Sequence, residues 1–297
     1  MEAACSTVPK AGMEIYTNTE RLHKHRKMIL ELLLANHCRD CTTCQKNGKC
    51  RLQELASLFG LESIRFKNLK PEPELDTSSL SIIRDAHKCI LCGDCVRMCN
   101  EIQNVGAIDF VNRGSKMVIG PAFNEPIANS PCVGCGQCAA VCPTGAIVIR
   151  KDTGRVWPEL NDKNTKVVAQ VAPAVRVAMA KEFGLPENEN SMGRITAALR
   201  RLGADVVYDT NLTADLTIME ESAEFLEKVK TGAKLPMFTS CSPGWVKYLE
   251  HHFPEMIPNM STCKSPMEME GAIIKTYYAE QAGMDPQDIF VVSIMPC

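Results

Sequence analysis

The residues of this chain that could do chemistry are mainly its cysteines, 16 among 297 residues. They gather at 38–50, 89–99 and 132–142, and later cysteines stand singly. Disulfide-rich secreted chains are usually short and begin with a signal peptide, whereas the first residues here show no basic segment followed by an apolar run. We therefore expect a cytoplasmic protein whose thiols are reduced and bound to metal.

Two of the cysteine groups share the spacing C-x₂-C-x₂-C-x₃-C, which is typical of bacterial two-cluster ferredoxins. In that motif three thiolates bind one 4Fe–4S cubane and the fourth reaches the other cubane. The first predicted ligand set is Cys89, Cys92, Cys95 and Cys142. The second predicted set is Cys132, Cys135, Cys138 and Cys99. Buried thiols without a ligand role are a poor explanation for a spacing that occurs twice.

The first cysteine group is less regular. Cys41, Cys44 and Cys50 follow the spacing C-x₂-C-x₅-C and supply three ligands, and the fourth is either His37 or Cys38. Three thiolates and one imidazole would also suit a structural zinc ion. Because the chain already carries cluster motifs, we interpret His37 as a ligand of a third 4Fe–4S cluster. Ligation by Cys38 and a zinc site are the alternatives.

Linkers divide the chain into segments of about 1–70, 71–158 and 159–297. Residues 70–79 are charged and contain proline, which predicts an extended linker, and residues 151–155 predict a turn. A helix in the first segment has Asn18 or Thr19 as its N-cap. Its apolar side, which we expect to pack in the core, consists of Met28, Leu32 and Ala35.

The last segment alternates between strand and helix patterns. Apolar runs predict strands at 167–172, 205–209, 235–239 and 289–294. Helical patterns occupy 191–202, with Gly203 as C-cap, and 217–230, 245–252 and 264–282. This alternation predicts a parallel α/β sheet, in which ligands bind beyond the carboxyl ends of the strands.

Bulk composition argues against two classes of partner. A net charge of −2 gives no indication of nucleic-acid binding. The most apolar stretch, residues 28–35, contains Glu31 and is too short to span a bilayer. We expect neither a nucleic-acid nor a membrane partner.

The order of these motifs resembles that of the FeFe hydrogenases, and most of all their multi-cluster, NAD(P)-linked catalytic subunits. The resemblance covers almost the whole chain: the His37 group, the two ferredoxin runs, Thr-Ser-Cys-Ser-Pro-Gly-Trp at 239–245 and Met-Pro-Cys at 295–297. It implies a fragment of an α+β multidomain protein, truncated at both ends.

The resemblance implies four regions. Residues 1–10 are the remnant of a 2Fe–2S ferredoxin domain whose last ligand is Cys5, unless that thiol is incidental. Residues 11–70 form a His-ligated 4Fe–4S module, and 71–158 a two-cluster ferredoxin-like domain. Residues 159–297 are the N-terminal part of a hydrogenase domain with an α/β fold.

The active site implied by the resemblance is the H-cluster, a 4Fe–4S cubane joined to a diiron centre. Cys297 matches a cubane ligand, and Cys241 matches the cysteine that passes protons to the open iron. The family's next cysteine, also a cubane ligand, is Ser242 here. Either Ser242 binds weakly through oxygen, or Cys241 changes role, or Cys263 substitutes. The backbone that approaches the diiron ligands is matched by Ala172 and Pro173.

The resemblance also implies a proton relay, matched here by Glu221, Glu224, Lys228 and Ser261. The first three fall on one face of a helix. From the sequence alone a surface row of salt bridges explains them equally well, and the family match favours the relay.

The implied activity is 2H⁺ + 2e⁻ ⇌ H₂. Electrons would enter at the His37 cluster or an upstream 2Fe–2S centre and pass through two cubanes, at potentials of order −400 mV. The implied partners are ferredoxin or NAD(P)-oxidising flavin and iron–sulfur subunits, in a hetero-oligomer. We expect this fragment alone to be inactive. The alternatives are a non-catalytic or sensory iron–sulfur module, and a zinc-rich binding protein.

Overall fold

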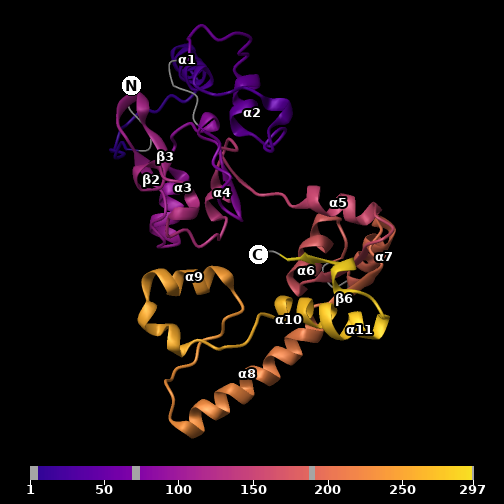
Figure 1. Cartoon of the computed structure of the whole chain (residues 1–297). Helices are drawn as coiled ribbons and strands as arrows, with labels where there is room; N and C mark the ends of the chain where they lie inside the picture. The colour runs from indigo at the N-terminus through magenta and orange to yellow at the C-terminus, as the bar shows by residue number, and fades with distance from the viewer. Residues whose placement is uncertain (1–5, 69–73, 187–190, 296–297) are drawn as a thin grey trace. The chain divides into compact units, whose positions relative to one another are not determined.

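The computed structural model describes residues 6–68, 74–186 and 191–295 (Figure 1). Predictions that concern Cys5, Cys297 and part of the 70–79 linker lie outside the described residues. The chain forms two compact units, the first made of Met1–Ser130 and Gly136–Ile149, the second of Pro131–Cys135 and Arg150–Cys297. The four predicted regions of the resemblance stay predictions.

The first unit begins with α1 (Glu20–Ala35). Of the two candidate caps Thr19 is the one used, because its hydroxyl accepts a hydrogen bond from the Leu22 N–H at 3.3 Å. Helix α2 (Arg51–Leu58) follows the first cysteine group.

The predicted core side of α1 is mostly wrong. Met28 and Leu32 are 39% and 44% exposed, whereas Ala35 is buried as expected. Glu31 is buried instead, because its carboxylate pairs with Arg65, with 2.7 Å between Oε2 and Nη2. A long-range ion pair, which periodicity does not reveal, decides which side of this helix faces inward.

The rest of the first unit contains two antiparallel strand pairs. Strand β1 (Ile82–Arg84) pairs with β4 (Ile147–Ile149), and β2 (Asp109–Val111) pairs with β3 (Val118–Gly120). Its short helices are α3 (Asp94–Arg97) and α4 (Gln137–Val141), with a π-helical turn at Met98–Ile102. Its 3₁₀ turns are Cys41–Thr43, Ala86–Lys88, Gly114–Lys116, Ala122–Asn124 and Ile127–Asn129.

Each ferredoxin-type run turns on a glycine. Gly93 and Gly136 precede α3 and α4 with φ of 77° and 71°, a left-handed conformation in which a side chain is strained. A Cβ at Gly136 would also lie 2.9 Å from Cδ1 of Ile149. These glycines let the chain turn between the second and third cysteines of each run.

The second unit contains the predicted parallel sheet, with strand order β6-β5-β7. Its members are β5 (Lys166–Val171), β6 (Val206–Asp209) and β7 (Ile289–Ile294). The strand predicted at 235–239 is wrong, because among the described residues this segment makes a single bridge, from Phe238 to Met260. Pro236 lacks a donor for a strand ladder, and the segment lies alongside residues 259–261 instead.

Helices make up most of the rest of the second unit. They are α5 (Thr153–Asn161), α6 (Pro173–Glu182), α7 (Met192–Leu202), α8 (Asn211–Thr231), α9 (Pro243–His252), α10 (Pro266–Ile273) and α11 (Ala279–Ala282). A π-helical turn at Ile274–Tyr278 joins α10 to α11, and 3₁₀ turns lie at Pro254–Asn259 and Pro286–Asp288. The predicted cap Gly203 is confirmed, with φ of 113°.

A second local prediction in this unit is also wrong. The turn expected at 151–155 gives way to α5, because Val156, Trp157 and Leu160 line an apolar groove beside the sheet and tertiary packing outweighs the turn signal. The core under α10 and α11 contains Val168, Ile274, Ala279 and Ile289. Across the described ranges, no helix is both long and apolar enough to cross a bilayer.

Candidate metal centres and proton relay

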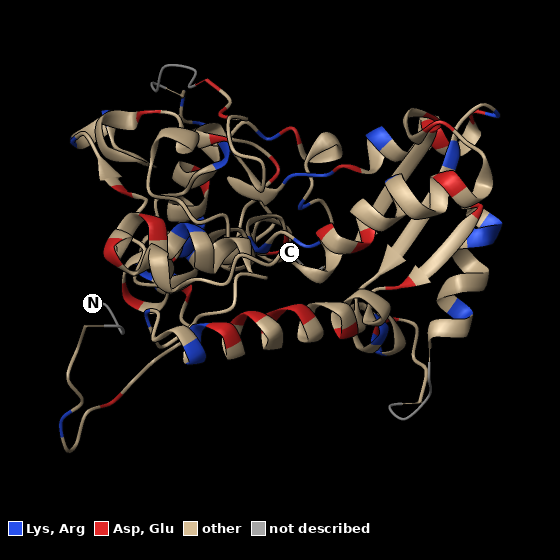
Figure 2. Cartoon of the chain, turned by 60° about the horizontal axis from the view of Figure 1, so that its bottom comes forward, with Lys and Arg blue, Asp and Glu red and all other residues tan. Residues whose placement is uncertain are grey.

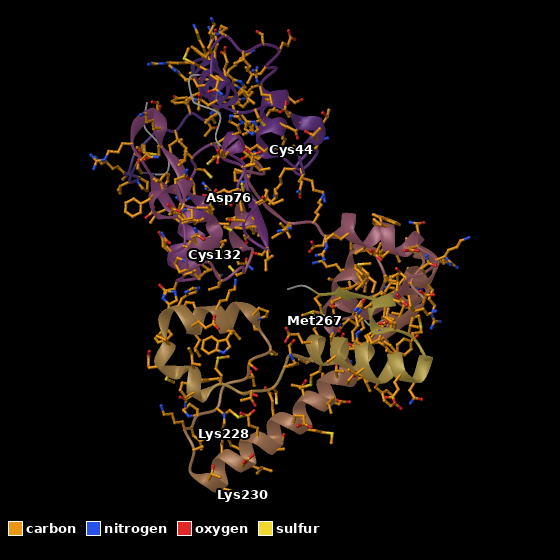
Figure 3. All side chains as sticks on the ribbon, in the orientation of Figure 1. Cys44, Asp76, Cys132, Lys228, Lys230 and Met267 are labelled. Carbon is orange, nitrogen blue, oxygen red and sulfur yellow. The ribbon has the colours of Figure 1, made fainter. Side chains whose placement is uncertain are left out.

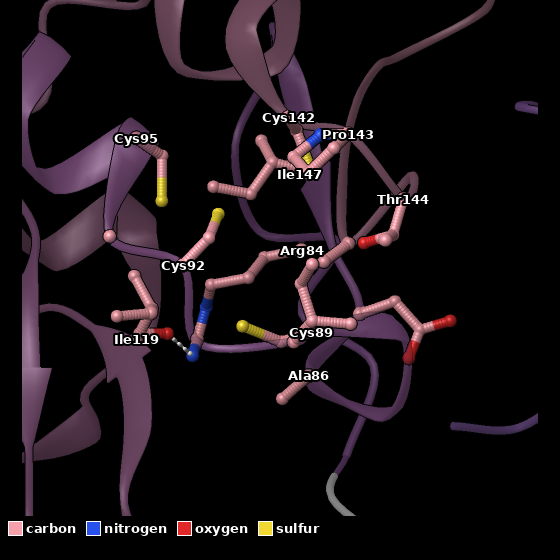
Figure 4. A pocket seen from close by; sticks show the side chains of 14 residues that line it. Arg84, Ala86, Cys89, Cys92, Cys95, Ile119, Cys142, Pro143, Thr144 and Ile147 are labelled. Carbon is pink, nitrogen blue, oxygen red and sulfur yellow. Dashed lines mark hydrogen bonds between the residues drawn. The ribbon is translucent and has the colours of Figure 1, made fainter. Parts of the chain in front are cut away.

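Four thiols of the first unit line one cavity (Figure 4). Three come from the loop before α3 and its first turn, and the fourth follows the end of α4: Cys89, Cys92, Cys95 and Cys142. Two separate ferredoxin runs thus contribute to one cavity. All 14 cysteines in the described part of the chain are free thiols.

The thiols in this cavity are crowded, and Cys95 and Cys142 are buried. Burial, together with the neighbouring Cys89, Cys142 and Cys92 sulfurs, raises the pKa of Cys95 to about 12. Four thiolates would repel one another here unless a cation group neutralised them, as the iron of a cluster does. The Leu91 N–H donates to the Cys89 sulfur at 3.4 Å, the kind of bond that orients a cluster ligand. The residues present therefore fit a 4Fe–4S cubane.

The less regular cysteine group lines a second cavity. Its polar lining includes His37, Cys38, Cys41, Cys44 and Cys50. Among the described residues, no three His, Cys, Asp or Glu side chains converge as ligands of a single ion. Since His37 and Cys38 both face this cavity, their placement alone does not choose between them.

His37 has the chemistry of a metal ligand. Its residue is 8% exposed, and its Nε2 is buried without a hydrogen-bond partner in the described part of the chain. Burial, with a smaller contribution from Lys88, lowers the pKa of His37, so the ring is neutral. Nδ1 accepts a hydrogen bond from the Arg39 N–H at 3.2 Å and lies 3.8 Å from the Cys38 sulfur, so a metal on Nε2, which places the proton on Nδ1, would replace the Arg39 bond. The orphaned Nε2 fits the predicted cluster.

The second predicted ferredoxin set is divided between the units. Cys99 and Cys138 belong to the first unit, and Cys132 and Cys135 to the second. Their joint ligation of a cubane stays a prediction.

In the second unit, Glu224 on α8 is the centre of a hydrogen-bonded group. Figure 2 shows in red the acidic residues along this long helix, and Figure 3 labels Lys228 and Lys230 near its end. Its Oε1 lies 2.9 Å from the Lys228 ammonium, one helical turn further on. Its Oε2 accepts from the Ser261 hydroxyl and from the Thr262 N–H, each at 3.0 Å. Lys228 also donates to the Met260 carbonyl at 3.1 Å. Three of the four predicted relay residues thus contact one another.

Two parallel segments bring Ser261 to this helix. The Ser261 N–H donates to the Phe238 carbonyl at 2.7 Å, so residues 259–263 run beside the segment that leads to Cys241. Cys263 joins the group, because its sulfur lies 3.8 Å from Glu224 Oε2 and its carbonyl accepts from Ser240 at 2.7 Å.

Hydrogen bonding controls the charge of Glu224. Partial burial acts to raise its pKa, but hydrogen bonds from Lys228, Thr262 and Ser261 outweigh burial and hold the pKa below the ordinary value of 4.5. Glu224 is therefore ionised near neutral pH and is an acceptor in the resting group.

The structure also describes other predicted site residues of this unit, but they are not hydrogen-bonded to this group. Glu221 is half-buried one turn earlier on α8, and Cys241 and Ser242 are exposed at the start of α9. The described hydrogen bonds do not link Glu221 or Cys241 to Glu224. Substitution by Cys263 for a missing ligand stays a prediction, because Cys297 lies outside the described residues.

Ala172 and Pro173 mark the carboxyl end of β5. The Ala172 N–H donates to the Ile294 carbonyl at 3.1 Å, which extends the β5–β7 ladder by one residue. Pro173 is exposed and begins α6, where its missing N–H costs no helical hydrogen bond.

Two buried charged residues were missed by sequence reasoning. Arg84 lines the first thiol cavity and is 8% exposed. Strand alternation could have found it, since Arg84 and buried Ile82 share one face of β1. Glu270 on α10 is 2% exposed, and no sequence pattern marks it.

Comparison with known proteins places the first unit in a class of cysteine-rich electron-transfer proteins. Residues 26–65 match the family model "NADH-ubiquinone oxidoreductase-G iron-sulfur binding region", and residues 88–146 match "4Fe-4S dicluster domain". Residues 165–297 match "Iron only hydrogenase large subunit, C-terminal domain". Over residues 165–297 the chain belongs to the iron-only, or FeFe, hydrogenase family.

Two curated relatives agree with this assignment. The chain is 45% identical to the NADP-reducing hydrogenase subunit HndD of Solidesulfovibrio fructosivorans, over 99% of this chain and 51% of that protein. It is 35% identical to iron hydrogenase 1 of Clostridium pasteurianum, with the same coverage. An apo FeFe hydrogenase structure from Chlamydomonas reinhardtii is 45% identical with a TM-score of 0.46, covering 49% of this chain and 38% of that chain. The chain spans about half the length of the curated relatives it matches.

Proposed function

We propose that this chain carries the electron-feeding and proton-delivering part of an FeFe hydrogenase, whose reaction is 2H⁺ + 2e⁻ ⇌ H₂ at an H-cluster. The observation that carries the proposal is the partly buried group of Glu224, Ser261 and Lys228, which lies beside the segment leading to Cys241 within the family-matched region. A plain electron carrier has no need of a shielded carboxylate and hydroxyl chain.

For electrons, the proposal assigns three 4Fe–4S clusters to this chain. Each cluster, when bound, supplies a one-electron store at low potential. The ligand sets are His37 with Cys41, Cys44 and Cys50; Cys89, Cys92, Cys95 and Cys142; and Cys132, Cys135, Cys138 and Cys99. The side chains around each set hold the sulfurs in place, which tunes the potential.

For protons, the route leads along α8 to Cys241. The ionised Glu224 accepts a proton at Oε2, where Ser261 already donates from its hydroxyl. Lys228 holds Oε1 and keeps the carboxylate in one orientation. Glu221 is the outer carboxylate of the route, and the thiol of Cys241 is its inner end. Ala172, Pro173, Ser242, Cys263 and Cys297 would surround the diiron centre and its cubane.

The partners and setting follow from the relatives. The chain is similar to a subunit named as NADP-reducing, which supports a hetero-oligomer with NAD(P)-oxidising flavin and iron–sulfur subunits. Ferredoxin is the alternative donor. The parent protein would work in an anaerobic cytoplasm.

The deciding experiment is infrared spectroscopy of the full-length, matured protein. Bands from bound CO and cyanide, together with H₂ evolution from a reduced viologen dye, are expected. Matured protein with full cubane iron and no such bands would contradict the proposal.

One observation favours a second candidate, a non-catalytic iron–sulfur module. The position of a cubane ligand in the family is occupied by Ser242, which is exposed and caps α9 without a side-chain hydrogen bond. A Ser242→Cys variant separates the two candidates: a module gains no CO and cyanide bands from it, whereas a hydrogenase keeps or strengthens them.

A further inference from the structure

A buried guanidinium lies in the wall of the first thiol cavity. Figure 4 shows the Arg84 side chain reaching across the cavity beside Cys89 and toward Ile119. Its Nη1 donates to the Ile119 carbonyl at 2.9 Å and to Asn124 Oδ1 at 3.0 Å. The residue is 8% exposed, so its charge is poorly screened by water.

The surroundings are shaped to hold this group. A Cβ on Gly120 would lie 2.7 Å from Arg84 Nη1 and 2.9 Å from Asn124 Oδ1, so glycine leaves the space that the guanidinium fills. This glycine is not needed for the backbone, because no positive φ is recorded at Gly120. The site therefore accommodates an arginine side chain specifically.

Asp76 is the counter-ion of Arg84. Its Oδ2 lies 3.4 Å from both Nε and Nη2 of the guanidinium, and the two side chains are 8% and 9% exposed. Asp76 has partners of its own, since Oδ2 accepts from the Ile127 N–H at 2.9 Å and Oδ1 from Ser78. The carboxylate would thus stay in place if Arg84 were removed.

We propose that Arg84 and Asp76 set the reduction potential of the cluster held by Cys89, Cys92, Cys95 and Cys142, as positioning charges of opposite effect. The inference rests on the proposed cubane in that cavity. When the cluster takes up one electron from a low-potential donor, no bond breaks and no proton moves, so the cluster gains one unit of negative charge. A fixed cation favours the reduced form, and a fixed anion opposes it.

The test is a redox titration of full-length holoprotein, followed by electron paramagnetic resonance. Arg84→Met is expected to lower the midpoint potential of one cubane, with about a tenfold smaller ratio of reduced to oxidised cluster at a fixed potential, which is about 59 mV for a one-electron couple. Asp76→Asn is expected to raise the same midpoint, because the cation then acts unopposed.

Two further variants separate charge from architecture. Arg84→Lys keeps the charge and should stay closer to the native midpoint than Arg84→Met. Arg97→Met removes an arginine of the same unit whose side chain is 57% exposed, and its midpoint shift should be far smaller. A purely structural role predicts loss of cluster without opposed shifts.

The outcomes are separable. Midpoints that do not move, or that move in the same direction for Arg84→Met and Asp76→Asn at full iron content, overturn the inference. If Arg84→Met loses its cluster, Asp76→Asn and Arg84→Lys decide. Native protein without cubane iron and sulfide would instead refute the proposed function.

Discussion

The thiol cavity of the first unit and the Glu224 group of the second unit handle negative charge in opposite ways. In the cavity, burial and neighbouring sulfurs raise the pKa of Cys95, and the charge is left for a bound cluster to neutralise. In the relay group, Lys228 and two further donors hold the pKa of Glu224 low without any metal. The cavity is complete only with its cofactor, whereas the relay group carries its own cation.

The two regions also differ in how they are assembled. The cavity takes three of its thiols from seven consecutive residues, 89–95, which turn on Gly93. The relay group joins residues 37 apart, which meet only because residues 259–263 run beside 236–240. A cluster site is thus mostly local in sequence, and a proton route is a product of tertiary packing.

The largest effect is expected in the thiol cavity. Cys95→Ala should remove one whole cubane, about four iron and four sulfide per chain, because the cavity then lacks a thiolate that no neighbour replaces. Iron and sulfide analysis of anaerobically purified full-length protein measures this. Val96→Ala, at a buried neighbour on the same helix, should keep the full complement. Equal losses in both variants would mean that the cavity responds to packing rather than ligation.

The second cavity offers a paired comparison of ligands. His37→Ala should lose or destabilise its cluster, because the orphaned Nε2 is the atom that faces a metal, whereas Cys38→Ala should retain its iron. Electron paramagnetic resonance counts the reduced clusters in each variant. The reverse pattern would assign the fourth ligand to Cys38.

In the relay group, Glu224→Gln should lower the H₂-evolution rate of the matured full-length protein by about 10²–10⁴-fold, since an amide cannot take up a proton at Oε2. Cluster content should not change. Glu227→Gln, at an exposed carboxylate of the same helix, is the matched control and should stay within about twofold. If the Glu224→Gln variant evolved H₂ at the native rate, protons would have to take another route.

Glu270 is a buried acidic residue of a third kind, because it has neither the bound cluster proposed for the thiol cavity nor a lysine like the one beside Glu224. Burial, together with the nearby Asp209 charge, raises its pKa above 4.5, although the Thr210 hydroxyl acts to lower it. Protonated Glu270 contributes fully to the stability of the folded state below pH 4.5. This contribution is lost as the pH rises through the higher folded-state pKa.

Glu270→Leu should therefore raise the free energy of unfolding at pH 8 by about 1–3 kcal/mol. The gain should shrink at acidic pH. Urea midpoints of anaerobic protein at the two pH values measure it, with exposed Glu268→Leu as control. A variant less stable at pH 8 would mean that Glu270 has a stabilising partner.

The smallest effect is expected from removing the relay's own cation. Lys228→Met should raise the pKa of Glu224, because burial then acts with one hydrogen bond fewer against it. Ionised Glu224 stabilises the native fold above pH 4.5, and this stabilisation is lost as the pH falls through the lower folded-state pKa. Because the folded-state pKa is higher in the variant, the variant loses this stabilisation at a higher pH than the native protein does. The cost near neutral pH should be about 0.5–1 kcal/mol.

The measurement is the acid-unfolding midpoint by circular dichroism. It should move to higher pH in Lys228→Met and stay in place in Lys230→Met, an exposed lysine on the same helix (Figure 3). Identical midpoints in the two variants would mean that Ser261 and Thr262 alone control the carboxylate.

Sequence reasoning succeeded where short-range geometry decides the outcome. The cap at Thr19, which was one of two candidates, the C-cap at Gly203 and the parallel arrangement of the sheet are as expected. It failed where a distant contact intervenes: Glu31 is buried by Arg65, and the segment at 235–239 pairs with 259–261 instead of joining the sheet.

The amino-acid sequence by itself determined the kinds of centre this protein holds, because cysteine spacing and glycine-dependent turns fix where thiols point over a few residues. Only the tertiary structure decided which charges face those centres. Arg84 enters the thiol cavity through strand pairing and a space left at Gly120, and Glu224 meets Ser261 through the packing of distant segments. Side-chain charge acts through space, and neighbours in space are chosen by the packed fold.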